Sequence, residues 1–320
     1  MLPPIVLAMH IPDGFLTGHV PEIGWVLAFV FIIFALRRAP SLGGRQVPLI
    51  TIGAAFIFAA QMMNFPVTGG TTGHLVGAVI IAILAGPWNA VLTLSIVVAI
   101  QALLFQDGGT MALGVNIFNM AVICTFTGYG VYKFITSRFG ETTRNQFVGA
   151  ALAAWTSVVV ASIVVSVQLA ISGTSPLDVA LPAMLRVHAL IGIGEALITV
   201  AVLALVMKIQ PELMHTSSAT AARISYRWIA AGLVVALLIA GLSPLADPNP
   251  DGLERVAEDL GFIEAAQGPT YEILPDYTTP FVGDAKLSTI VAGEIGVLVV
   301  GSIGYLVARM SSRRKEQPLT

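Results

Sequence analysis

The chain of 320 residues is 56% hydrophobic and only 11% charged, with a mean hydropathy of +0.86 and a net charge of −2. Soluble globular domains carry about 25% charged residues, so this composition excludes an ordinary water-soluble fold and predicts an integral membrane protein. We expect it in the inner or plasma membrane, surrounded by lipid and without a nucleic-acid partner.

Long apolar runs predict an all-α polytopic membrane helix bundle, because they lack the alternating pattern of outer-membrane strands. Only Gly86-Pro87 separates the third run from the fourth, so these two are compatible with one kinked or re-entrant unit, and eight or nine crossings remain open. The spans are expected near residues 22–37, 47–65, 74–86, 88–105, 113–135, 146–171, 182–207, 227–245 and 288–308.

Basic residues set the expected orientation, since cytoplasmic flanks of membrane helices collect Lys and Arg. Alternate loops hold 13 of the 16 basic residues, whereas only Arg255 and Lys286 fall in the other loops and Arg186 is undecided. The amino-terminal region is therefore predicted outside the cell and the C-terminus in the cytoplasm.

A Met-His pair, Met9-His10, precedes the first span. Another histidine, His74, lies 64 residues after His10, at the end of a glycine- and threonine-rich stretch. A Met-His step offers backbone nitrogen and imidazole in fused chelate rings, and a distant His completes a planar nitrogen set that suits Ni(II), Co(II) or Cu(II). The Pro12-Asp13-Gly14 turn is expected to fold the pair back against the bundle. The alternative is a surface His10 and an interfacial His74.

The start of the third span indicates the local structure around His74. Thr71 or Thr72 is expected to cap that helix, which puts His74 in its first turn, where the helix dipole keeps the imidazole neutral and available as a ligand.

Three further residues are candidates for a second shell or a metal pathway: Asn64, His188 and Glu195. His188 and Glu195 lie seven residues apart on one helix face, and an intramembrane carboxylate is costly unless it is paired. A structural ion pair or hydrogen bond is an equal alternative for both, and Asn64 is alternatively a helix terminator.

The segment between Asp247 and Asp284 holds nine of the 18 acidic residues and is predicted to be an exposed outer loop. It either concentrates divalent cations or is simply a solvated face, and the second reading is favoured. Residues from about 226 onward resemble a two-helix module fused to a larger core.

The sequence lacks two common catalytic motifs. There is no G-x-x-x-x-G-K-[ST] phosphate loop and no H-E-x-x-H zinc-protease motif, and the single cysteine, Cys124, lies in an apolar run. Energy for any transport must therefore come from a partner or an ion gradient.

Several motifs resemble the cobalt/nickel substrate-binding membrane component of energy-coupling-factor ABC transporters, the CbiM/NikM family. They are Met9–Phe15, Asn64–Pro66, Gly69–His74 and Val187–Glu195, and the similarity covers about residues 9–215. Pro250–Glu254 reads Pro-Asp-Gly-Leu-Glu and resembles the signature of the small CbiN/NikN companion.

The resemblance implies about seven helices in a core of residues 9–225, and two transmembrane helices in a companion-like module of residues 226–320 with its acidic loop at 247–284. It implies that Met9 supplies its α-amine, His10 its amide nitrogen and imidazole, and His74 a last nitrogen to a roughly square-planar metal. The metal is transported Co(II) or Ni(II), with no resident cofactor. A transmembrane coupling protein and cytoplasmic ATPases are the implied partners.

Residues 1–8 precede the methionine whose free amine the resemblance requires. We expect Met9 to be the true start, with removal of a leader as the second choice; if the extension persists, Met9 offers only an amide nitrogen.

An ATPase-independent, ion-coupled carrier with Glu195 as relay is the alternative function, and a membrane metalloenzyme or metal sensor is a weaker one. Nothing in the sequence separates cobalt from nickel.

Overall fold

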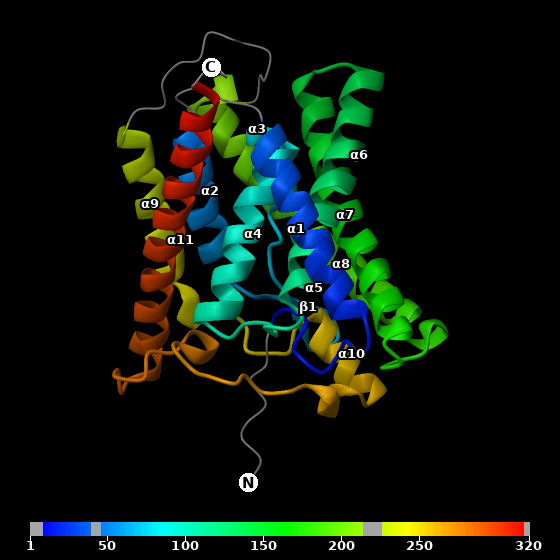
Figure 1. Ribbon diagram of the computed structural model, residues 1–320. Helices are drawn as coiled ribbons and strands as arrows, with labels where there is room; N and C mark the ends of the chain where they lie inside the picture. The colour runs from blue at the N-terminus through cyan, green and yellow to red at the C-terminus, as the bar shows by residue number, and fades with distance from the viewer. Residues whose placement is uncertain (1–8, 40–45, 214–225, 317–320) are drawn as a thin grey trace.

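The computed structural model describes residues 9–39, 46–213 and 226–316, which form a bundle of helices (Figure 1). The amino-terminal half contains α1 (Val20–Arg38), α2 (Gln46–Gln61), α3 (Ala78–Ala85), α4 (Pro87–Leu104), α5 (Leu113–Ile117), a π-helix η2 (Phe118–Ile123) and α6 (Cys124–Phe139). The rest contains α7 (Thr143–Ile171), α8 (Leu177–Ile209), α9 (Tyr226–Gly241), α10 (Gly252–Leu260) and α11 (Ala285–Glu316).

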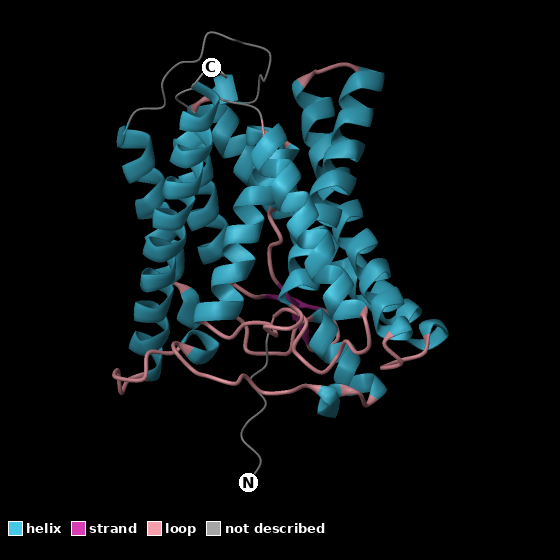
Figure 2. Cartoon of the chain, viewed as in Figure 1, coloured by secondary structure: helices cyan, strands magenta, loops and turns pink. Residues whose placement is uncertain are grey.

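The predicted class, an all-α polytopic membrane bundle, is confirmed. Six helical stretches in the described part of the chain are long and apolar enough to cross a bilayer: α1, α4, Leu113–Phe139, α7, α8 and Ala285–Met310. Val47–Gln61 and Trp228–Gly241 are apolar but shorter. Among the described residues, the strands form a single hairpin of β1 (Phe65–Val67) and β2 (Thr71–Gly73), seen between the helix ends in Figure 2.

The predicted third span at 74–86 is not one helix. Its helical part, α3, has eight residues and is about 12 Å long, far short of a bilayer core of roughly 30 Å. Gly86 then turns the chain directly into α4 with φ +86°, and Pro87 occupies the first helical position. The two runs are therefore a short buried helix and a full-length one joined at a glycine, as the kinked alternative allowed.

The loops that matter for function gather at one end of the bundle, which we call the site end; it carries α10 and the β-hairpin (Figures 1 and 2). The basic C-terminal turns of α1, α6 and α8 lie at the opposite end, in the order that alternating spans require. Arg45 and Arg223, which also contributed to the predicted orientation, lie outside the described residues.

Two helices of the C-terminal part, α9 and α11, share the core of the bundle. α11 packs against α2 and α9, and α2 also packs against α9. Gly296 on α11 lets this happen, since a Cβ there would lie 2.0 Å from the Phe58 ring of α2. Burial of such aromatic and aliphatic side chains is the main source of packing free energy, although inside lipid it acts through close contact rather than through exclusion of water.

The acidic segment 247–284 is not wholly exposed, which corrects the prediction at its Pro-Asp-Gly-Leu-Glu motif. Asp251 and Glu254 form a reciprocal capping box at the start of α10 and are 6% and 7% exposed. The helix packs on α8 and β2, and its apolar side chains join the amino-terminal segment in a small core. The sequence predicts an exposed loop here because the acidic residues outnumber the few apolar residues that anchor the segment. These apolar residues are Leu253, Val256, Ala257 and Phe262.

Candidate metal site

The segment around Met9 and His10 folds back against the site end of the bundle, as the turn signal predicted. The Ile11 amide donates to Asn116 Oδ1 at 3.1 Å, and Asn116 Nδ2 donates to the Ile11 carbonyl at 3.0 Å. The Asp13 carboxylate accepts from the Ala112 amide and the Thr110 hydroxyl. The start of α5 therefore satisfies the polar groups of a buried loop, which would otherwise cost free energy.

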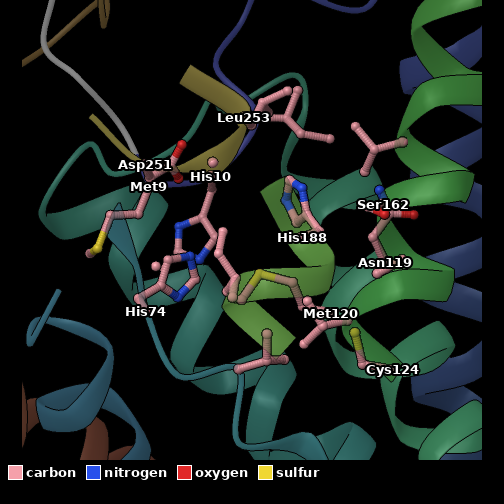
Figure 3. A pocket seen from close by; sticks show the side chains of 18 of the residues that line it. Met9, His10, His74, Asn119, Met120, Cys124, Ser162, His188, Asp251 and Leu253 are labelled. Carbon is pink, nitrogen blue, oxygen red and sulfur yellow. The ribbon is translucent and has the colours of Figure 1, made fainter. Parts of the chain in front are cut away.

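His10 and His74 meet although 64 residues separate them in sequence. Their ring centroids are 5.7 Å apart with an interplanar angle of 68°, and Figure 3 shows the two imidazoles side by side. His10 is buried at 4% exposure, so the alternative of a surface His10 is wrong. Its Nε2 atom has no hydrogen-bond partner among the described residues.

A third residue, Asp107, holds His10 and was missed by the sequence analysis. Its Oδ1 lies 3.1 Å from His10 Nδ1, while its Oδ2 accepts a 2.6 Å hydrogen bond from the Tyr277 hydroxyl. Gln101 Nε2 donates to the same hydroxyl oxygen at 3.1 Å. A carboxylate in this position fixes the orientation of the imidazole.

The pKa values of this pair follow from burial and charge. Burial alone would lower the pKa of His10, but the charge of Asp107 and its hydrogen bonds outweigh burial, so the His10 pKa is raised. Burial likewise opposes ionisation of Asp107, yet the interactions with His10 and the Tyr277 hydrogen bond lower its pKa. Both shifts favour the charged forms, so the contact is an ion pair whenever His10 is protonated.

His74 does not lie in a helix, and the predicted capping by Thr71 or Thr72 is wrong. Both threonines belong to β2; the Thr71 and Thr72 hydroxyls donate to the Pro250 carbonyl, and Thr72 also reaches the Asn249 carbonyl. The helix begins only at Ala78, since Gly77 has φ +73°. The His74 imidazole is kept neutral by burial, with the charge of His10 as the second cause, and its pKa falls to about 4.

The Glu195 carboxylate of α8 holds the segment between His74 and α3. It is fully buried, and its two oxygens accept from the Val76 and Gly77 amides at 2.7 and 2.9 Å. These bonds satisfy two amides of the extended chain between His74 and α3 inside the bundle, where an unsatisfied backbone amide is costly. The hydrogen-bonded alternative for Glu195 is therefore the one the contacts support.

His188 and Asn64 line two different cavities. His188 lines the same cavity as the two site histidines, and its Nδ1 donates to the Met184 carbonyl at 2.9 Å. Asn64 lines a neighbouring cavity instead, and its carbonyl accepts from the Asp247 amide.

The cavity beside the two histidines has a volume of about 110 Å³ and reaches toward the interior of the bundle. Figure 3 shows Asn119, Met120, Cys124 and Ser162 on its inner side, with Asp251 and Leu253 near its outer side. In the described part of the chain no three His, Cys, Asp or Glu side chains approach closely enough to hold a metal together. The extension Met1–Ala8 lies outside the described residues.

Comparison with known proteins gives two family matches that together span most of the chain. Residues 10–213 match CbiM, described as the cobalt uptake substrate-specific transmembrane region, and residues 226–313 match the PDGLE domain.

Individual relatives agree with these matches. The chain is 36% identical to a putative fused nickel transport protein NikMN of Archaeoglobus fulgidus, covering 94% of this chain and 98% of that one. It is 31% identical to the fused nickel transport protein NikMN of Rhodobacter capsulatus, covering 92% and 96%. A crystal structure of a truncated transition metal transporter aligns with a TM-score of 0.56 at 34% identity, covering 62% of this chain and 99% of that one.

Proposed function

Because the chain belongs to the CbiM family of cobalt and nickel transport membrane proteins and carries a PDGLE domain, we propose that it is the metal-capturing subunit of an energy-coupling-factor ABC importer. It is a transporter component rather than an enzyme. Transport energy comes from cytoplasmic ATPases through a transmembrane coupling protein. The sequence itself has no phosphate-binding loop, which supports a division of labour.

The metal ligands are Met9, His10 and His74. The observation that carries this assignment is the 5.7 Å separation of the two buried imidazoles, reached from distant parts of the chain. A chelate through the amide nitrogen and the imidazole of His10 closes a six-membered ring only through Nδ1, the atom that Asp107 now contacts. Metal capture therefore exchanges the Asp107 contact and the proton of His10 for the metal.

The site faces the exterior and the basic helix ends face the cytoplasm. The positive-inside rule and the position of α10 and the hairpin at the other end of the bundle support this orientation. The inner part of the site cavity, past Met120 and His188, leads away from the exterior and is the route of handover.

The decisive test is metal analysis of the purified protein. We expect stoichiometric Ni(II) or Co(II) in the parent chain, loss of most of it in His10→Ala, and no loss in His19→Ala, since the His19 side chain is 93% exposed. Uptake into vesicles should require both the coupling protein and the ATPases. Full metal content in His10→Ala contradicts the ligand assignment, and ATPase-independent uptake favours the ion-coupled carrier.

The α-amine role of Met9 has its own test. Amino-terminal sequencing of the metal-bound protein from its native host should begin at Met9. A metal-bound chain that still begins at Met1 rules out the amine, and leaves Met9 an amide nitrogen at most.

A further inference from the structure

A second cavity of about 270 Å³ lies beside the histidine cavity, and Met9 and Asp251 line both. We call it the acidic chamber. Its charged and amide-bearing walls come from both family-matched parts of the chain: Asn64, Asp107, Asp247, Asn249, Asp251, Glu254 and Asp276. Since one water occupies about 30 Å³ in the liquid, the chamber has room for an ion with its hydration shell.

Two residues that line the chamber each carry a buried side-chain oxygen for which the described part of the chain offers no hydrogen-bond partner. Glu254 is 7% exposed, and its Oε2 accepts from the Asp251 amide in the capping box, but its Oε1 has no hydrogen-bond partner among the described residues. Asn64 Oδ1 is in the same condition. Buried oxygens without donors are unfavourable unless a cation or its waters fill the space beside them.

Charge points to a cation rather than to a neutral ligand. No Lys or Arg is among the described residues that line the chamber. Asp107 is already paired with His10 and Tyr277, whereas the Glu254 carboxylate faces no positive side chain there. A low-dielectric cleft lined by one sign of charge focuses its field and raises the local concentration of the opposite ion.

We propose that the acidic chamber binds a hydrated divalent cation, which waits there before it enters the nitrogen site past Met9 and Asp251. The carboxylates hold it through its own water molecules, since no three of them approach closely enough for a bare ion. The role as a waiting position rests on the proposed import function. The existence of the oxygen-lined site does not.

Mn(II) is the probe that separates the two sites, because it prefers oxygen ligands while the histidine site is nitrogen-rich. The full chain is titrated with Mn(II), and the bound fraction is read from the loss of the free-ion electron paramagnetic resonance signal. We expect Mn(II) binding in the parent chain and in His10→Ala, and its loss in Glu254→Gln. The capping box accepts Gln at this position, so the variant keeps the start of α10.

Glu258→Gln is the matched control, because it removes the same charge from an exposed position on the same helix. It should bind Mn(II) like the parent chain. Asp276→Asn, an exposed residue at the chamber wall, should weaken Mn(II) binding without affecting the fold. Equal Mn(II) binding by the parent chain and Glu254→Gln, or none in the parent chain, overturns the proposal.

The role of the chamber as a waiting position is tested separately, by measuring the rate of Ni(II) loading. In Glu254→Gln we expect loading to slow by roughly tenfold at low salt while the final Ni(II) content stays unchanged. An unchanged loading rate overturns the waiting role. Retained Ni(II) in His10→Ala contradicts the ligand assignment of the proposed function and leaves the Mn(II) result standing.

Discussion

At the scale of single residues, the site is defined by what holds His10 rather than by the histidines alone. Asp107 contacts the imidazole at 3.1 Å and is itself held by the Tyr277 hydroxyl at 2.6 Å. Tyr277 comes from the segment between α10 and α11, so the PDGLE-matched part of the chain supports a proposed ligand of the CbiM-matched part.

Tyr277→Phe should weaken metal binding about tenfold, because the buried Asp107 carboxylate that metal capture releases from His10 then loses its tyrosine partner as well, and outer hydrogen bonds of a metal site are typically worth 10- to 100-fold in affinity. The substitution keeps the ring that stacks on Phe105 and removes only the hydroxyl. Tyr271→Phe is the control, because its hydroxyl donates to the Leu103 carbonyl away from His10. Isothermal titration with Ni(II) measures both variants, and equal affinities contradict the positioning role of Tyr277.

At the scale of elements, the β-hairpin joins the bundle to the acidic segment. The Thr72 amide donates to the Pro250 carbonyl at 2.9 Å, and the Thr72 hydroxyl reaches the Asn249 and Pro250 carbonyls. These contacts seat Asp251 over the cavity that His10 and His74 line.

Thr72→Val should loosen this junction while keeping the β-branched shape that suits a strand. We expect faster amide hydrogen exchange in α10 and in the hairpin, with the rest of the bundle unchanged. Thr93→Val is the control, since Thr93 is equally buried but donates only to Asn89 in its own helix. Identical exchange in α10 of the two variants would show that the hydroxyl contributes nothing to the junction.

The stretch between His74 and α3 depends on a partner from α8. Glu195→Ala should leave the Val76 and Gly77 amides unsatisfied at about 1–3 kcal/mol each, and so lower the melting temperature and the metal affinity together. Glu294→Ala, at an exposed position on α11, is the control and should do neither. Thermal unfolding in detergent with and without Ni(II) checks both. A stable Glu195→Ala with normal affinity contradicts the anchoring role.

At the scale of the whole molecule, the sequence predicts the bundle well because long apolar runs have few alternatives in a membrane. It also predicts that His10 and His74 meet. It fails at 74–77 because Leu75 and Val76 look like the start of a helix, while the contacts that keep them extended come from Glu195, more than a hundred residues later.

The sequence does not predict Asp107 as a site residue, for a related reason. The Gln106-Asp107-Gly108-Gly109 break after a long apolar helix was a visible polar island, but its partners lie 97 residues before it and 170 residues after it. Local patterns carry no information about such distant pairs. Asp251 and Glu254 were assigned to solvent because their charges were counted without the apolar residues that bury them.

The orientation of the whole molecule is testable with cysteine labelling, because the chain has a single cysteine, Cys124, and it is buried. In intact cells, a membrane-impermeant maleimide should label Thr278→Cys, which is exposed near the site end, and should not label Ser137→Cys, which is exposed near the basic end. The parent chain gives the background. Labelling of Ser137→Cys alone would invert the proposed topology.

The hydrogen bond between Asp107 and Tyr277 also matters for biogenesis. A ribosome makes both imidazoles early, but Tyr277 follows every α-helix that the structure describes except α11. A growing polypeptide therefore carries its nitrogen donors for most of its synthesis without the tyrosine that steadies them. Under the proposed ligand assignment, firm metal retention matures only with insertion of the last helix, and an unfinished chain does not sequester the ion.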